Sequence, residues 1–272
     1  MTAGESWLIE GTGTAVDNVI YIGTDATVTL NGINITDQIE CAGDATIILA
    51  DGSENKVTVS TNGLAGIQIG GTGKTLTING ETAGDGKLTV QGGSGAAGIG
   101  TSMDETGGNI VINGGTVTAT GGNGAAGIGT GYSFGSGAPT NQTCGDITIN
   151  GGIVTATGGM YGAGIGTGYS FYNNAVTSNE CGAITIGTGV TSVTAIMGTG
   201  SPISIGMGAS NGYSGHSGTQ TCGTITFGTA AVFNGAVWSP APMVAGTYGG
   251  LTLAISTTTN ADDTWTLTPV AP

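Results

Sequence analysis

Short segments in which apolar and polar residues alternate recur along this chain. In Ile147-Thr-Ile-Asn150 and in Val154-Thr-Ala-Thr157 every second residue is apolar, and this period of two indicates β-strands with one buried face. A third segment, Ala163-Gly-Ile-Gly-Thr167, follows a Gly-Gly pair that suits a tight corner. Because each segment is too short to be stable by itself, we expect every strand to depend on pairing with others.

The three segments recur together, in the same order, at a nearly constant period. Residues 110–130 and 147–167 are the clearest copies, and weaker copies begin at Leu76, Ile184 and Ile225. Such a repeat predicts a solenoid in which each strand pairs with its copy on the next coil, about 4.8 Å away. We therefore expect an all-β, right-handed parallel β-helix with three strands and about 37 residues per coil. An antiparallel sandwich is the alternative, but it does not explain the constant order of the strands.

The repeats divide the chain into three parts. Regular solenoid coils are expected over residues 75–227. Residues 1–74 contain strand-like segments with a looser period, and we interpret them as irregular opening β coils with an N-terminal cap. Residues 228–272 lose the Gly-Gly pattern, and their segments 251–255 and 264–268 predict a pair of strands. Because the end of a solenoid leaves strand edges unpaired, we interpret this last part as a C-terminal cap.

Alternation also assigns the faces of the strands. The isoleucines of the third segment should form an inner column, which consists of Ile99, Ile128, Ile165 and Ile205. The glycines beside them, such as Gly98 and Gly100, would then form a flat outward face that is nearly bare of side chains. The edge of that glycine face would carry Thr101, Thr130 and Thr167. The residues that follow the third segment, such as 131–145, are expected to form a loop that closes the coil.

Two side-chain ladders follow from the register. Asn79, Asn113 and Asn150 occupy one corner position, where stacked amides can hydrogen-bond along the axis. A second corner position holds Cys144, Cys181 and Cys222, and Cys41 precedes an earlier strand in a similar context. A buried thiol ladder is the favoured interpretation, while a disulfide between neighbouring coils and a metal site stay open as alternatives.

Composition and charge restrict the partners. Hydrophobic residues reach 38% and charged residues only 7%, so the chain can build a core and is not expected to be disordered. The formal net charge is −14, with three Lys, no Arg and one His. Phosphate backbones and anionic lipid surfaces are bound through Lys and Arg, so we expect neither nucleic acid nor an anionic membrane as a partner.

The location of the protein is inferred from composition as well. The sequence shows no basic leader segment, and it has no run of about 18 apolar residues that would predict a transmembrane helix. A scarcity of Lys and Arg with abundant Gly, Thr and Asn is typical of exported proteins. We therefore expect an extracellular or cell-surface protein whose signal segment has been removed.

Candidate catalytic groups are few, and we expect no enzyme and no cofactor. A glycosidase needs two facing carboxylates, which Asp146 with Glu180 or Asp104 with Glu105 could supply. Neither pair lies in a supporting motif, and His216 lies in a Gly/Ser-rich loop without a catalytic partner. The acidic loops show no ligand spacing for calcium, although calcium binding by some of them stays open.

The outward positions of the second segment form the most regular surface. Thr118 and Thr120 on one coil should lie beside Thr155 and Thr157 on the next. Thr89 and Thr194 extend the first column, while Gln91 and Ile196 interrupt the second. Hydroxyls and methyls would repeat about 6.6 Å apart along a strand and about 4.8 Å apart across strands. This grid resembles the Thr-x-Thr faces of β-solenoid ice-binding (antifreeze) proteins, and the resemblance implies ice and ordered water as the partner.

Two other functions stay open. The repeats over residues 75–227 also resemble those of Gly/Thr-rich bacterial cell-surface β-helix proteins, which implies a structural or adhesive module able to self-associate. A glycan-binding module is the second possibility, because aromatic residues recur after the third segment. They lie in residues 132–134 and 169–172 and at Tyr213. Packing of these aromatics against each other over one flank is the simpler interpretation.

Overall fold

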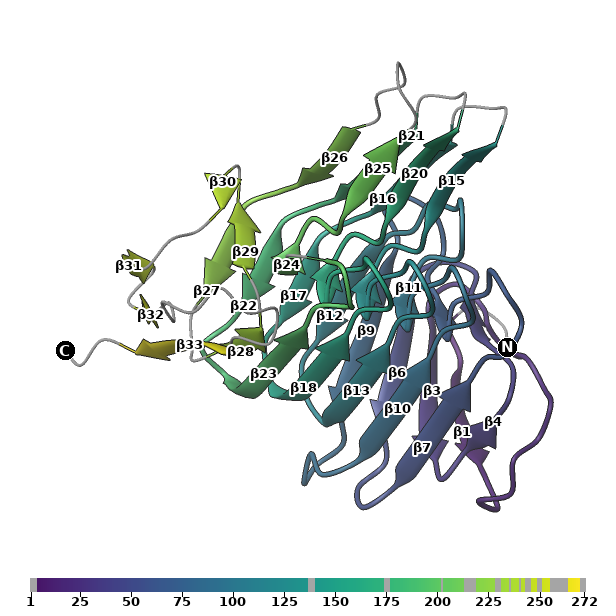
Figure 1. The fold of residues 1–272 in the computed structure, drawn as a ribbon. Coiled ribbons are helices and arrows are strands. Elements are labelled where there is room, and N and C mark those ends of the chain that lie inside the picture. Colours follow the sequence, from purple (N-terminus) through teal and green to yellow (C-terminus); the bar gives the residue numbers. More distant parts are fainter. Residues whose placement is uncertain are drawn as a thin grey trace.

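The chain winds around one axis in successive coils, and each core strand of a coil pairs with its copy on the next coil (Figure 1). This pairing builds three parallel sheets that run along the axis. The computed structural model describes residues 4–136, 140–173, 177–201, 203–212, 219–227, 231–234, 236–239, 241–242, 246–248, 251–254 and 264–269. Sheets A, B and C contain the first, second and third strands of each repeat, respectively. The chain is therefore an all-β parallel β-helix with three core strands per coil, which confirms the expected fold class.

The strands have the following bounds. Sheet A consists, in spatial order, of β1 (Ser6–Glu10), β3 (Ala26–Asn31), β6 (Ala45–Leu49), β9 (Thr75–Gly80), β12 (Asn109–Ile112), β17 (Ile147–Ile149), β22 (Ile184–Ile186) and β27 (Ile225–Phe227). Sheet B contains β4 (Asn34–Ile35), β7 (Glu54–Thr58), β10 (Lys87–Gln91), β13 (Thr116–Thr120), β18 (Gly152–Thr157), β23 (Val190–Ile196) and β28 (Ala231–Asn234). Sheet C contains β2 (Ile20–Ile22), β5 (Ile39–Cys41), β8 (Ile67–Gln68), β11 (Ile99–Gly100), β14 (Ile128–Gly129), β19 (Ile165–Gly166), β24 (Ile203–Gly206), β29 (Ala236–Ser239) and β30 (Ala241–Pro242).

The core lies along the axis and is built from stacked aliphatic columns. In sheet A, Ile110 pairs with Ile147 and Ile147 with Ile184, and all three side chains are fully buried. The predicted column of sheet C is also buried, and it consists of Ile99, Ile128, Ile165 and Ile205. The inward and outward faces inferred from alternation are therefore confirmed for these strands.

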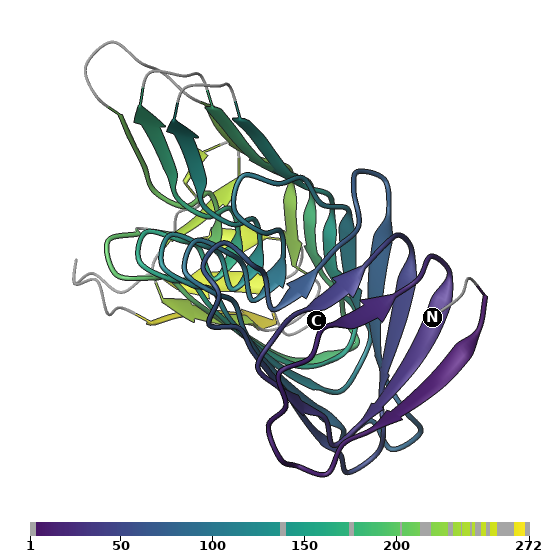
Figure 2. The ribbon, with the colours of Figure 1, turned by 90° about the vertical axis from the view of Figure 1, so that its right-hand side faces the viewer.

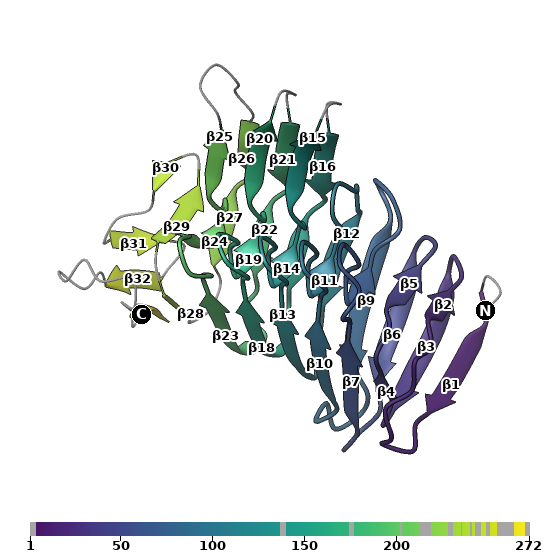
Figure 3. The same ribbon diagram turned by 45° about the vertical axis from the view of Figure 1, so that its right-hand side comes forward.

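The opening coils belong to the same three sheets. Ser6 pairs with Thr27, Ala26 with Ala45, and Ala45 with Leu76, so the early coils are shorter than the later ones but remain in parallel register. The segment 67–71, which resembles the third segment of the repeat, supplies β8 of sheet C. Figure 3 shows these coils stacking directly on the regular ones.

The prediction of a loop after the third strand is wrong for residues 131–145, because this part of the coil forms two further strands. β15 (Ser133–Ser136), β20 (Ser170–Asn173) and β25 (Ser210–Gly212) form one three-stranded sheet. β16 (Thr140–Cys144), β21 (Thr177–Cys181) and β26 (Thr219–Cys222) form another. The two sheets project together from the solenoid, as Figure 2 shows at its upper left, and we call them the ribbons.

Polar side chains between the ribbons explain why sequence patterning missed them. Gln142 and Asn179 are fully buried where β16 and β21 meet the solenoid. Ser133 and Ser170 are also fully buried, on β15 and β20. Because the inner face of each ribbon is polar, the apolar alternation that indicates a half-buried strand is absent from these segments.

The C-terminal part changes from parallel to antiparallel pairing. β33 (Thr264–Pro269) pairs antiparallel with β28 and with β32 (Leu251–Ala254), and β31 (Gly246–Tyr248) pairs with β32. The strand pair predicted at 251–255 and 264–268 is thus confirmed. These strands continue sheet B beyond its last parallel strand.

The asparagine ladder also has the predicted form. Asn113 Nδ2 donates a hydrogen bond to Asn79 Oδ1 at 2.9 Å, and Asn150 Nδ2 donates to Asn113 Oδ1 at 3.0 Å. Each amide therefore links two coils at the end of a sheet A strand, which is a structural role.

Within the ranges described above, the structure contains no helix that is long and apolar enough to cross a membrane.

Candidate functional site

The six predicted threonines lie together on the outward face of sheet B. Thr89 pairs with Thr118, Thr118 with Thr155, and Thr155 with Thr194, which gives one uninterrupted column. Thr120 pairs with Thr157 in the next column. Gln91 and Ile196 flank that pair, as the sequence indicated. Figure 3 shows β10, β13, β18 and β23 side by side, with the ribbons projecting from the opposite end of the view.

A third column on this face contains Thr116, which sequence reasoning missed. Thr116 pairs with Lys87 on one side and with Ile153 on the other, and Ile153 pairs with Ser192. The signal was present in the sequence, because Thr116 continues the same alternation two residues before Thr118. The strand β13 therefore offers three outward threonines, and we call the outward face of β10, β13, β18 and β23 the threonine face.

Small and branched core residues hold these strands in register. Val117 and Ala119 alternate with the threonines of β13 and are fully buried, as are Val154 and Ala156 on β18. The register shifts only between Gly152 and Ile153, at the start of β18. Because a slip by one residue would expose the buried set, the inner face fixes which side chains reach the solvent.

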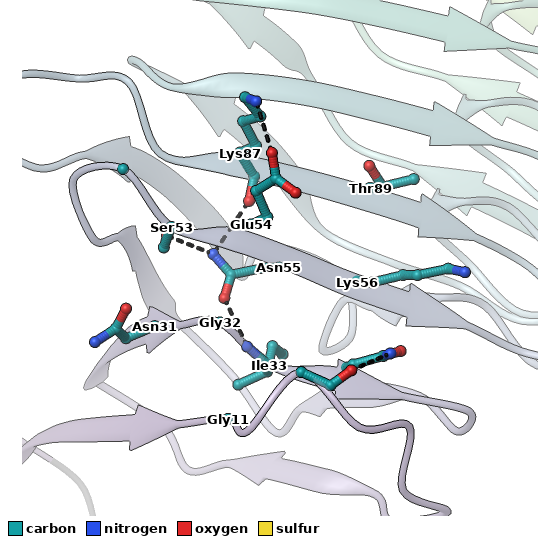
Figure 4. Close-up of a pocket in the computed structure, with 13 residues that line it drawn as sticks. Gly11, Asn31, Gly32, Ile33, Ser53, Glu54, Asn55, Lys56, Lys87 and Thr89 are labelled. Atoms are coloured by element: carbon teal, nitrogen blue, oxygen red, sulfur yellow. Dashed lines mark hydrogen bonds and ion pairs between the residues drawn. The ribbon is translucent and has the colours of Figure 1, made fainter.

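Charged residues border the threonine face at its N-terminal side. Figure 4 shows Lys87 Nζ donating a hydrogen bond to Glu54 on the neighbouring strand, at 2.8 Å from Oε1. Lys56 pairs with Thr89, so it precedes the threonine column on sheet B. The hydrogen bond with Lys87 lowers the pKa of Glu54, and the same contact raises the pKa of Lys87. Both side chains are exposed to solvent, so water and salt screen this pair.

A hollow of about 640 Å³ lies beside these charges. A buried amide, Asn55, forms part of its lining (Figure 4). Its Oδ1 accepts from the Ile33 N–H at 3.1 Å, and its Nδ2 donates to Ser53 Oγ at 2.8 Å and to the Lys87 carbonyl at 3.1 Å. Asn55 thus satisfies backbone groups where the short opening coils meet the longer ones.

Sheet A carries a second threonine column that the sequence interpretation did not identify. It consists of Thr27, Thr46, Thr77, Thr148, Thr185 and Thr226, with Val111 between the third and the fourth. Its neighbouring column holds Thr29 on an opening coil, and then Ile48 and the asparagine ladder. The threonine array on this sheet is therefore only one residue wide over its regular coils.

The prediction that the glycines of the third segment form a bare outward face is wrong. Gly98 and Gly100 are buried, and Thr101, Thr130 and Thr167 are fully buried at the base of the ribbons. A Cβ atom on Gly100 would overlap the carbonyl oxygen of Gly129 on the next coil. The glycines at this position therefore allow close backbone approach between coils and do not create an open surface.

The three buried threonines connect the ribbons to the solenoid. Thr130 Oγ1 donates to Asn179 Oδ1 at 2.5 Å and accepts from the Gly168 N–H at 2.8 Å. Thr167 Oγ1 donates to Gln220 Oε1 at 2.6 Å on the next coil. Thr101 Oγ1 accepts from Gln142 Nε2 at 2.8 Å. Each coil that carries ribbons thus repeats one threonine–amide hydrogen bond.

We expect Thr130→Val to destabilise the protein by at least about 2 kcal/mol, because valine keeps the shape but leaves two buried polar groups unpaired. Urea unfolding would measure this change. Thr118→Val, at a half-buried position of the threonine face, is the matched control and should stay within about 0.5 kcal/mol of the wild type. Equal stability of the two variants would contradict the role assigned to Thr130.

The cysteines are free thiols in this structure. Cys144, Cys181 and Cys222 are in register on β16, β21 and β26, which confirms the ladder, whereas Cys41 belongs to β5 in sheet C. Hydrogen bonds with Cys144 and Cys222, together with burial, raise the pKa of Cys181. Burial raises the pKa of Cys41 from 9.0 to about 12, with a smaller contribution from the charge of Glu40.

The buried thiol of Cys41 predicts a loss of stability at high pH. Because its pKa is raised in the folded state, the folded protein binds this proton more tightly than the unfolded chain does. The resulting stability is present below about pH 9 and is lost as the pH rises toward 12. Urea unfolding between pH 8 and 11 should therefore show a steeper fall for the wild type than for Cys41→Ala. Parallel pH profiles would contradict this prediction.

The acidic candidates for catalysis make structural hydrogen bonds. Asp146 Oδ1 accepts from the Ala183 N–H at 2.8 Å, and Asp104 Oδ1 accepts from the Phe134 N–H at 2.8 Å. Glu105 Oε2 accepts from Gln68 Nε2 at 3.0 Å. Among the described residues, no group of three or more His, Cys, Asp or Glu side chains is placed to hold a metal ion. His216 lies outside the described residues.

Comparison with known proteins supports the fold. A family profile described as "Beta helix repeat" matches residues 110–132 and 147–169. These two matches are the coils in which the repeat is clearest in the sequence and in which β12, β13 and β14, and then β17, β18 and β19, occur. No curated protein and no solved structure matches the chain.

Proposed function

We propose that this β-solenoid is a non-enzymatic, extracellular ice-binding protein and that the threonine face binds the ice. The observation that carries the proposal is the in-register column of Thr89, Thr118, Thr155 and Thr194, with Thr120 and Thr157 beside it. Parallel strands place these side chains about 4.8 Å apart across the sheet and about 6.6 Å apart along each strand. A lattice of water molecules can match a grid with two fixed spacings of this kind.

The chemistry of the threonine face suits ordered water. Threonine offers a methyl group that water must surround and a hydroxyl group that can anchor a water molecule by hydrogen bonding. Its β-branched side chain has few rotamers, so little conformational freedom is lost when water orders around it. Lys87, at the N-terminal border, is the only charged side chain among the outward residues of β10, β13, β18 and β23.

The width of the threonine array favours sheet B over sheet A as the binding face. The threonine column of sheet A is longer, but its neighbouring amides already hydrogen-bond to each other along the axis. Sheet B has threonines in adjacent columns on both β13 and β18. A crystal plane is recognised in two dimensions, so a two-column array is the better match.

Thermal hysteresis of the purified protein tests this proposal. We expect freezing to be depressed below the melting point, with an effect that grows with protein concentration, and we expect ice crystals to grow with faceted shapes. A solution that freezes at its melting point and yields round, unshaped crystals at millimolar protein would rule out ice binding.

A further inference from the structure

A cleft lined by aromatic and methionine side chains lies on a different part of the solenoid from the threonine face. Its volume is about 390 Å³. It is lined by Asn62, Ser94, Gly95, Met103, Asn123, Gly124, Tyr132, Met160, Tyr161 and Tyr169. These residues come from several coils, so the cleft follows the solenoid axis.

Regular backbone hydrogen bonds create one wall of the cleft. The corners that follow β7, β10, β13 and β18 each have a residue with positive φ, whose carbonyl accepts from a residue of the next coil. Tyr132 N donates to the Gly95 carbonyl at 2.8 Å, and Tyr169 N donates to the Gly124 carbonyl at 2.6 Å. Met103 N donates to the Gly63 carbonyl at 3.0 Å in the same way. One column therefore holds Met103, Tyr132 and Tyr169.

The aromatic rings of the cleft form a continuous platform. Tyr132 and Tyr169 are stacked, with ring centroids 5.5 Å apart and an interplanar angle of 9°. Tyr161 meets Tyr169 with a centroid distance of 4.8 Å. Phe134 and Phe171 form a parallel stack next to the tyrosines, at 5.7 Å. The expectation that the aromatics pack together over one flank is confirmed for Tyr132, Phe134, Tyr169 and Phe171, while Tyr213 and the side chain of Tyr172 lie outside what the structure describes.

Tyr161 reaches this platform from a strained backbone position. Its φ is +68°, whereas the equivalent corners of other coils have glycine, with φ of +83° at Gly124 and at Gly200. A positive φ in a bulky residue costs about 1–3 kcal/mol, and such strain is concentrated at functional sites. The Tyr161 ring lies over Gly200, where a Cβ atom would overlap it. The chain thus places a large aromatic side chain where stability alone favours glycine.

The side chains of the cleft combine apolar surface with uncharged polar groups. Tyr161 is 37% exposed, and Met103 and Met160 are 38% and 43% exposed. Asn62, Ser94 and Asn123 are exposed beside them and can donate and accept hydrogen bonds. No lining residue carries a charge, so an uncharged ligand with both apolar and hydroxyl surfaces fits best.

We propose that this cleft binds a neutral glycan. Sugar rings present C–H faces that pack against aromatic rings and hydroxyl groups that hydrogen-bond to amides. Nucleic acid bases also stack on aromatic side chains, but the net charge of −14 repels their phosphates. The extension of the cleft over several coils favours a chain of sugars over a single one.

Affinity electrophoresis in gels that contain a soluble polysaccharide tests the proposal. The probes are hydroxyethylcellulose, xylan and galactomannan, with polygalacturonate as the anionic comparison. We expect at least one neutral polysaccharide to retard the wild type, and polygalacturonate to have no effect. If none of the three neutral polysaccharides retards the wild type, the proposal is overturned.

The Tyr161→Gly variant tests whether the Tyr161 side chain serves glycan binding or the stability of the fold. This variant removes the ring and the strained φ together, so its thermal stability should be kept or raised while its affinity for the retarding polysaccharide falls at least tenfold. Tyr21→Ala, which removes a tyrosine that is 60% exposed on β2, is the control and should bind like the wild type. Unchanged binding by Tyr161→Gly would contradict the site. Thermal hysteresis of Tyr161→Gly should equal that of the wild type, so failure of this proposal is distinguishable from failure of ice binding.

Discussion

Gly129→Ala is expected to destabilise the solenoid by more than about 4 kcal/mol, which is an exceptional loss for a single methyl group. Gly129 has a φ of +133°, a region that is essentially restricted to glycine. An added Cβ would also overlap the carbonyl group of Gly166 on the next coil. Because coils stack on both sides, neither neighbour can move away without breaking its own sheet hydrogen bonds.

Two other glycines distinguish the effect of the positive φ from that of the close approach between coils. Gly73→Ala shares the positive φ, at +79°, but its Cβ would meet no atom within 4 Å, so it should cost only about 1 kcal/mol. Gly71→Ala has neither constraint and should be close to neutral. Thermal unfolding followed by circular dichroism measures all three variants. Similar melting temperatures for Gly129→Ala and Gly73→Ala would contradict the close approach between coils.

The stacking of coils was predictable from the sequence because it follows from a repeated local pattern. Ile147 and Ile184 recur at one period with alternating neighbours, and this repetition requires strands that pair coil to coil. The asparagine ladder was predictable for the same reason, since identical residues at one register position must stack. The six threonines assigned to sheet B follow from the same alternation.

Features that depend on contacts between different parts of a coil were not predictable. Alternation placed Gly100 on an outward face, but this position is buried and lies against the backbone of the next coil. The ribbons themselves were missed because Gln142 and Asn179 fill an inner face where apolar residues are usual. Polar residues that are satisfied only by tertiary partners, such as Thr130, look like surface residues in a sequence.

The candidate surfaces also include some residues that the sequence pattern could predict and others that it could not. Thr116 could have been found by extending the alternation of β13 by one step. The threonine column of sheet A was harder to recognise, because the opening coils are shorter and Thr27, Thr46 and Thr77 do not share the later period. The strain at Tyr161 is a backbone property, and a single tyrosine at a glycine position gave no sign of it.

Combined replacement of Thr118 and Thr155 by tyrosine is expected to abolish thermal hysteresis. These threonines are neighbours at the centre of the threonine face, so two bulky side chains there would hold an ice surface away from the remaining threonines. Both positions are half-buried and point outward. The fold should therefore be kept, which circular dichroism can verify before activity is measured.

The matched control places the same two tyrosines on sheet A. Thr148 and Thr185 are also half-buried neighbours on adjacent coils, so Thr148→Tyr combined with Thr185→Tyr changes size and chemistry equally but leaves the threonine face intact. If ice binds to the threonine face, this control retains the activity of the wild type.

Thermal hysteresis of the wild type and these two double variants, measured at one protein concentration, tests the central claim most directly. If ice binds to the threonine face, the wild type and the sheet A variant should both show thermal hysteresis. The sheet B variant should show less than about one tenth of the wild-type hysteresis, because the two-dimensional array is the contact surface. Absence of activity in the wild type, or loss of activity only in the sheet A variant, would contradict the assignment of sheet B as the ice-binding face.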